Sequence, residues 1–152
     1  MKRIVSVLLA LILLAALVIV AATSKHGVRA VYAQSGCSVA TLSGSYAVSQ
    51  SGFTPKKLNG NQLPVADVGV FTFDGAGNTS LTYTDVFNGV ISTGLTGTGT
   101  YTVSSDCTGS ITLTTGNAAG AAANIVIIGG GAEWFGINTG PSITATLDAK
   151  KQ

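Results

Sequence analysis

Apolar and small polar residues alternate along most of the chain from Leu42 onward. A period of two is typical of β-strands with one buried face, because successive side chains of a strand point to opposite sides of the sheet. In the clearest run, residues 95–103, one face carries threonines and the other carries Leu95, Gly97, Gly99, Tyr101 and Val103. We expect the threonines to point outward and the inward glycines to permit a sharp bend or a close approach, as barrel corners require.

Turn-forming residues divide this region into about eight predicted strands. The predicted strands are residues 44–49, 66–73, 79–87, 95–103, 110–115, 121–128, 133–138 and 143–147. Gly52–Pro55 is expected to end the first strand, and Asp74–Asn78 and Asn88-Gly89 predict hairpin turns. The run 121–128 is apolar throughout, and we interpret it as a strand covered on both faces.

Consecutive strands joined by short turns, each with an apolar face and a Thr/Ser face, indicate an all-β fold. The expected architecture is a small antiparallel up-and-down β-barrel of about eight strands. A two-sheet β-sandwich is the alternative that the same pattern allows.

The N-terminus has the pattern of an export signal. Lys2 and Arg3 precede an uninterrupted run of apolar and small residues, 4–22, and the sequence before Gln34 favours cleavage after Ala33. We therefore expect a signal peptide over residues 1–33, including an apolar signal helix, and a single β-barrel domain over residues 34–152. The predicted location is secreted, periplasmic or on the cell surface. The alternative is a membrane anchor formed by residues 4–22, because such a run is long enough to span a bilayer.

Composition supports one folded domain and argues against a nucleic-acid partner. Charged residues make up 9% of the 152 residues, against about 25% in average soluble proteins. Removal of residues 1–33 would leave four lysines and six acidic residues, a net charge of −2. The processed chain would then have no clustered cationic face, so we expect no nucleic-acid partner. Contact with a membrane is expected only through an uncleaved N-terminal segment.

The two cysteines, Cys37 and Cys107, are expected to form a disulfide in an oxidising compartment. The loop-entropy model assigns roughly 4 kcal/mol of stabilisation to closing a loop of about 70 residues. A redox or metal site would instead call for a closely spaced cysteine pair, which this chain lacks.

Five segments resemble a family of uncharacterised exported bacterial proteins. The segments are Leu42–Tyr46, Val68–Asn78, Gly99–Val103, Asp106–Ser110 and Gly130–Glu133. The resemblance implies a small calycin-like barrel, similar to lipocalins and to the barrel of allene oxide cyclases. These segments are turn and strand signatures, so no catalytic residue carries over from the family.

The candidate catalytic and metal-binding residues are few, and none forms a recognised constellation. His26, the single histidine, precedes the predicted cleavage point, so the processed chain lacks a histidine for a catalytic triad or a metal. Asp74 and Asn78 supply too few oxygens for calcium, and we interpret 74–78 as a hairpin turn. Gly129–Gly131 lacks the spacing of a phosphate-binding loop. We therefore expect no catalytic residues, no metal and no cofactor.

Aromatic residues on the predicted inward faces are candidates for binding a small apolar ligand. The candidate ligand-binding residues are Phe71, Tyr83, Tyr101, Glu133 and Trp134. Glu133 would orient the polar end of a ligand if it projected into the barrel, where an apolar wall would raise its pKa. As a surface residue it would instead be an ordinary exposed charge.

Three functions are compatible with this sequence. The leading hypothesis is a secreted, non-catalytic β-barrel that binds a small apolar or amphipathic ligand or simply serves as a stable extracellular module. The first alternative is a cell-surface structural protein that self-associates or docks on the envelope through sheet edges. The second is an isomerase- or cyclase-like barrel enzyme. A connected cavity of about 300 Å³ or more, lined by several of Phe71, Tyr83, Tyr101 and Trp134, would favour ligand binding, and a filled interior would favour the structural role.

Overall fold

The computed structural model describes residues 36–58, 61–141 and 143–152, which form one short 3-10 turn and eight β-strands. The predicted signal segment, residues 1–33, lies outside them. The elements are η1 (Val39–Thr41), β1 (Ser43–Leu58), β2 (Asn61–Asp74), β3 (Asn78–Phe87), β4 (Val90–Val103), β5 (Thr108–Gly116), β6 (Ala122–Ile128), β7 (Glu133–Asn138) and β8 (Thr144–Lys151). No helix in these ranges is long and apolar enough to cross a membrane.

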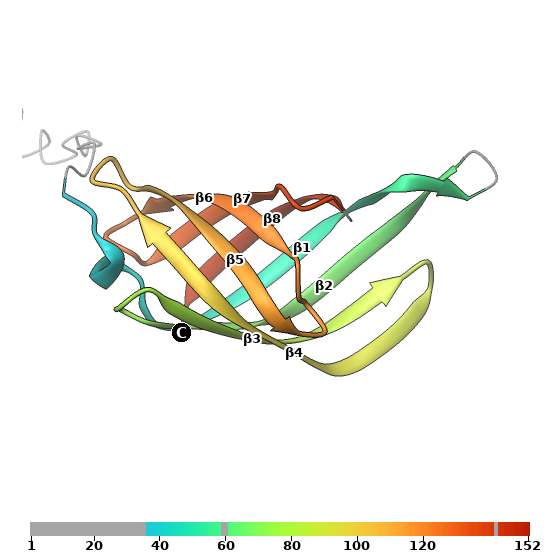
Figure 1. Cartoon of the computed structure of the whole chain (residues 1–152), viewed down its shortest axis with the longest axis horizontal. Helices are drawn as coiled ribbons and strands as arrows, with labels where there is room; N and C mark the ends of the chain where they lie inside the picture. The colour runs from blue at the N-terminus through green and yellow to red at the C-terminus, as the bar shows by residue number, and fades with distance from the viewer. Residues whose placement is uncertain (1–35, 59–60, 142) are drawn as a thin grey trace, which may run out of the picture. The chain divides into compact units, whose positions relative to one another are not determined.

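The eight strands form a closed barrel in sequence order (Figure 1). Each strand pairs antiparallel with its neighbours in the chain, and β8 closes the barrel by pairing with β1 over Tyr46–Phe53. The all-β, up-and-down barrel is therefore confirmed, and the alternative of two separate sheets does not occur. This architecture is compatible with a calycin-like barrel.

Alternation of inward and outward residues explains the threonine content of the wall. On β4, Tyr101 is buried, whereas Thr100 and Thr102 on either side of it are exposed. Cross-strand hydroxyl pairs such as Thr102 with Ser110, 2.8 Å apart, join β4 to β5 on the outer face. Hydroxyl pairs of this kind add to cross-strand stability.

The interpretation of 121–128 as a strand covered on both faces is wrong. In β6 the buried residues Ala123, Ile125 and Ile127 alternate with exposed ones, and Val126 and Ile128 are 50% and 41% exposed. An apolar run alone does not show whether both faces of a strand are buried, because burial of the outer face requires another layer of structure packed against the sheet.

The β1–β2 hairpin extends beyond the barrel wall (Figure 1), and β1 does not end at the predicted break, Gly52–Pro55. β1 continues through this segment to Leu58, paired with β2, although its pairing with β8 stops at Phe53. The register of β1 and β2 shifts after Phe53, so the break signals mark an irregularity within a hairpin. The β1–β2 and β3–β4 hairpins both project at the end of the barrel away from η1 (Figure 1).

Aromatic side chains fill the half of the barrel next to η1. Trp134, Tyr46 and Phe73 are at most 1% exposed. Phe73 meets Tyr46 and Tyr101 edge-on, with ring centroids 5.4 and 4.9 Å apart. These are favoured geometries for aromatic pairs. The filled half forms the main hydrophobic core.

The segment before β1 covers this end of the barrel and is held by covalent and polar contacts. Cys37 forms the predicted disulfide with Cys107 in the β4–β5 turn, with Cα atoms 5.0 Å apart. The hydroxyl of Tyr101 lies 2.8 Å from the carbonyl oxygens of both Val39 and Leu42. Leu42, the last residue of this segment, is itself fully buried. The barrel is therefore closed at one end.

Candidate functional site

The other half of the barrel contains a cavity of about 270 Å³ that opens at the end opposite η1. Its apolar wall comes from inward residues of five strands: Val48, Phe71, Leu81, Ile111, Leu113 and Leu147. Phe71 separates the cavity from the filled half, since its ring packs edge-on against Trp134 with centroids 5.7 Å apart. The cavity thus has an aromatic floor, formed by Phe71, and an open mouth.

Small residues keep this half of the barrel hollow. Gly69 on β2 lies directly opposite Tyr83 on β3, and a Cβ atom at Gly69 would lie only 2.7 Å from the Cβ of Tyr83. Residues 118–123, at the end of the β5–β6 connection and the start of β6, contribute alanines and a glycine to the lining. Because these side chains are short, they leave space empty in this half of the barrel, whereas aromatic rings fill the corresponding space at the closed end.

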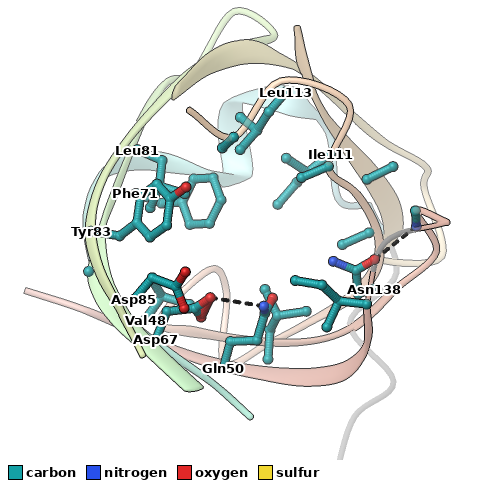
Figure 2. A pocket seen from close by; sticks show the side chains of 18 of the residues that line it. Val48, Gln50, Asp67, Phe71, Leu81, Tyr83, Asp85, Ile111, Leu113 and Asn138 are labelled. Carbon is teal, nitrogen blue, oxygen red and sulfur yellow. Dashed lines mark hydrogen bonds between the residues drawn. The ribbon is translucent and has the colours of Figure 1, made fainter. Parts of the chain in front are cut away.

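Two aspartates form a polar wall near the mouth, and sequence analysis did not identify them. Asp67 on β2 and Asp85 on β3 are direct cross-strand partners, and both line the cavity. Gln50 on β1 donates a hydrogen bond from Nε2 to Oδ2 of Asp67 over 3.0 Å. Figure 2 shows Gln50, Asp67 and Asp85 gathered on one side of the cavity, with Ile111 and Leu113 across from them.

The surroundings of these carboxyl groups favour their protonated forms. Burial, followed by the nearby charge of Asp85, raises the pKa of Asp67 to about 6. Burial also raises the pKa of Asp85. The pKa of Tyr83 is raised by burial and then by the two aspartates. The Oδ1 atom of Asp85 is buried and accepts no hydrogen bond from any residue that the structure describes.

The structure brings two of the five candidate ligand-binding residues to the cavity. Phe71 and Tyr83 line it. Tyr101 and Trp134 are buried at 3% and 0% exposure in the filled half, because their positions along β4 and β7 lie near the covered end. Glu133 neighbours the inward Trp134 and instead pairs across the wall with Lys150, with Oε1 and Nζ 3.4 Å apart.

The signal for the two aspartates was present in the alternation of β2 and β3. Asp67 is in phase with Gly69, Phe71 and Phe73, and Asp85 is in phase with Leu81 and Tyr83. Extending each inward face by two residues places both carboxylates inside the barrel. The pairing of the two residues follows from the β2–β3 register, which the turn at 74–78 sets.

The loop 74–78 is a hydrogen-bonded hairpin turn, as its sequence predicts. Oδ1 of Asp74 accepts hydrogen bonds from the backbone N–H groups of Ala76 and Asn78, and Oδ2 accepts one from Nδ2 of Asn78. These bonds, the side-chain bond foremost, lower the pKa of Asp74. Among the described residues, no group of three or more His, Cys, Asp or Glu side chains is placed to hold a metal ion.

No family model matches this chain, and no curated protein matches its sequence.

Proposed function

We propose that this protein is an exported, non-catalytic β-barrel that binds a small, largely apolar molecule in its open half. The observation that carries the proposal is the cavity of about 270 Å³, which has largely apolar walls and a polar side on which Gln50, Asp67 and Asp85 gather (Figure 2); Asn117 and Asn138 also line it. Ligand pockets generally combine an apolar lining with a few convergent polar groups.

The dimensions of the cavity limit the ligand to a compact molecule. A volume of about 270 Å³ is just below the range of about 300–1,000 Å³ that is typical of ligand pockets, so we expect a compact ligand. A long acyl chain or a multi-ring molecule would have to extend through the mouth.

Export is part of the proposal. The Cys37–Cys107 disulfide is typical of proteins in oxidising compartments. The basic and apolar N-terminal residues, and the resemblance of the turn motifs to exported bacterial proteins, support the same location. Two measurements test this part: immunodetection of the protein outside the cytoplasm, and a mass equal to that of a chain that begins at Gln34.

The test of binding is native mass spectrometry of the protein purified from its own host. We expect a retained small molecule in the wild type and its loss in Leu81→Trp, which enlarges an inward side chain of the cavity wall. Thr82→Trp is the matched control, because Thr82 is the exposed neighbour on the same strand. Bare protein in every preparation would refute the proposal, and so would a molecule retained equally by the wild type and both variants.

One observation favours a catalytic role as the second candidate. Adjacent carboxyl groups with raised pKa values are suited to proton transfer, because one can remain protonated while the other is ionised. Such a barrel would act as an isomerase or cyclase. Chromatography and NMR of the released molecule distinguish the two roles: a binding protein releases its ligand unchanged after incubation, whereas an enzyme converts it to an isomer of the same mass.

A further inference from the structure

The cavity lining carries acidic groups without an opposing basic group. Its described lining residues include Asp67 and Asp85, and none of them is Lys, Arg or His. A ligand with a carboxylate group would therefore lose its hydration and lie near Asp67 and Asp85 without a basic group to neutralise its charge. Charge repulsion of this kind excludes ligands effectively in a site of low dielectric.

The acid pair also has unused hydrogen-bonding capacity. Asp67 accepts one hydrogen bond from Gln50, whereas Oδ1 of Asp85 is buried without a donor among the described residues. A buried acceptor without a donor is unfavourable, so a ligand that donates N–H bonds here relieves that cost. An ammonium group supplies three donors and a positive charge.

The arrangement of the walls defines the rest of the ligand. The acids lie on β2 and β3, and the apolar residues Ile111 and Leu113 lie across the cavity on β5 (Figure 2). A molecule that placed a charged end against the acids would therefore lay its body against aliphatic and aromatic side chains. The volume admits a body of about one ring or a short branched chain.

We propose, on the basis of the binding role above, that the cavity selects organic amines: a protonated amino group on a compact apolar body. The amino group lies between Asp67 and Asp85, and the body lies toward Phe71 and Leu113. Both carboxylates are ionised in the complex, because the cation offsets their mutual repulsion.

Binding of the amine should weaken in acid. Asp85 and Tyr83 on β3 are the titratable groups described beside Asp67, and the neighbouring β1 contributes the neutral Gln50. Protonation of Asp67 removes one negative charge from the polar wall. We expect the affinity for an amine to fall several-fold between about pH 7.5 and about pH 4.5, while a neutral ligand is unaffected.

Three probes with one aromatic ring and different ends test the inference: 2-phenylethylamine, 2-phenylethanol and phenylacetate. Isothermal titration of the ligand-stripped protein at about pH 7.5 should rank the amine about tenfold or more above the alcohol, with phenylacetate weakest. Equal affinities, or a preference for phenylacetate, would overturn amine selection while leaving a binding role intact. Binding of none of the probes would also overturn it, and the proposed function itself is judged separately by the molecule retained from the host.

Charge-removing variants assign the preference to the acid pair. In the double variant Asp67→Asn/Asp85→Asn, we expect the affinity for the amine to fall about tenfold and that for the alcohol to stay within about twofold. Asp148→Asn is the matched control, because Asp148 is an exposed aspartate on the outer face of β8. An unchanged amine preference in the double variant contradicts the inference, and a thermal melt verifies that each variant is folded.

Discussion

Replacing Asp67 by asparagine should stabilise the barrel at neutral pH and leave its stability unchanged in acid. Folding places the Asp67 carboxylate in the cavity wall directly opposite Asp85, where like charges on neighbouring strands are destabilising. Asparagine keeps the shape of the side chain and an oxygen that can accept the hydrogen bond from Gln50, which is 3.0 Å long in the wild type. The substitution therefore removes the charge and little else.

The size of the effect follows from the pKa. Burial, followed by the charge of Asp85, raises the pKa of Asp67 from 3.8 to about 6. Each pKa unit corresponds to about 1.36 kcal/mol of differential interaction, which sets an upper limit of about 3 kcal/mol. Because the side chain is only partly buried, solvent screening reduces this value, and we expect a gain of about 1–2 kcal/mol.

The sign and the pH window follow from proton binding. From pH 3.8 to about pH 6, the native protein binds more protons at Asp67 than the unfolded chain does. Consequently, this carboxyl lowers the free energy of unfolding as the pH rises through that window, and its effect is constant above it. The gain from Asp67→Asn should be absent below about pH 4 and complete above about pH 7.

Urea denaturation at several pH values, monitored by the fluorescence of the single tryptophan, measures this difference. The same experiment on Asp148→Asn controls for the loss of an ordinary surface charge. The reasoning is refuted if Asp67→Asn is no more stable than the wild type at about pH 8, or if it is equally stabilised at about pH 4.

Further variants test the closed half of the barrel. The double variant Cys37→Ser/Cys107→Ser should be less stable than the wild type by roughly 4 kcal/mol, because the disulfide closes a loop with a sequence separation of 70 residues. The loss is measured as a lower midpoint of urea denaturation. Trp134→Ala should cost about 3–5 kcal/mol, since this ring is fully buried; the adjacent Phe135→Ala, 46% exposed, should cost less than about 0.5 kcal/mol. Tyr101→Phe should cost about 1–2 kcal/mol, because it leaves the covering segment without a hydroxyl donor. A calorimetric melting temperature equal to that of the wild type would contradict any of the three destabilisations.

Local pattern was sufficient to predict the strands because it records which face of each strand is buried. The turns at 74–78 and 88–89 and the outward threonines of β4 were predicted from residue type and spacing alone. Errors arose where another element decides the outcome. The segment Gly52–Pro55 has the residues of a break, yet pairing with β2 carries β1 through it to Leu58.

The candidate site was predicted less well than the fold. Aromatic residues are equally suited to a core and to a pocket, so their type alone could not separate Phe71 and Tyr83, which line the cavity, from Tyr101 and Trp134, which fill the barrel. Distance along the barrel axis separates them, and that distance depends on the stagger of all eight strands.

The sequence by itself determined an all-β antiparallel fold of about eight strands with one disulfide, because alternation, turn residues and two cysteines act within a strand or between a single pair of residues. Only the tertiary structure decided that the sheet closes into a barrel, and that one half of its interior is filled and the other is hollow. It also decided that Asp67 and Asp85 face each other there, because closure of the sheet and its register bring together residues that no local pattern connects.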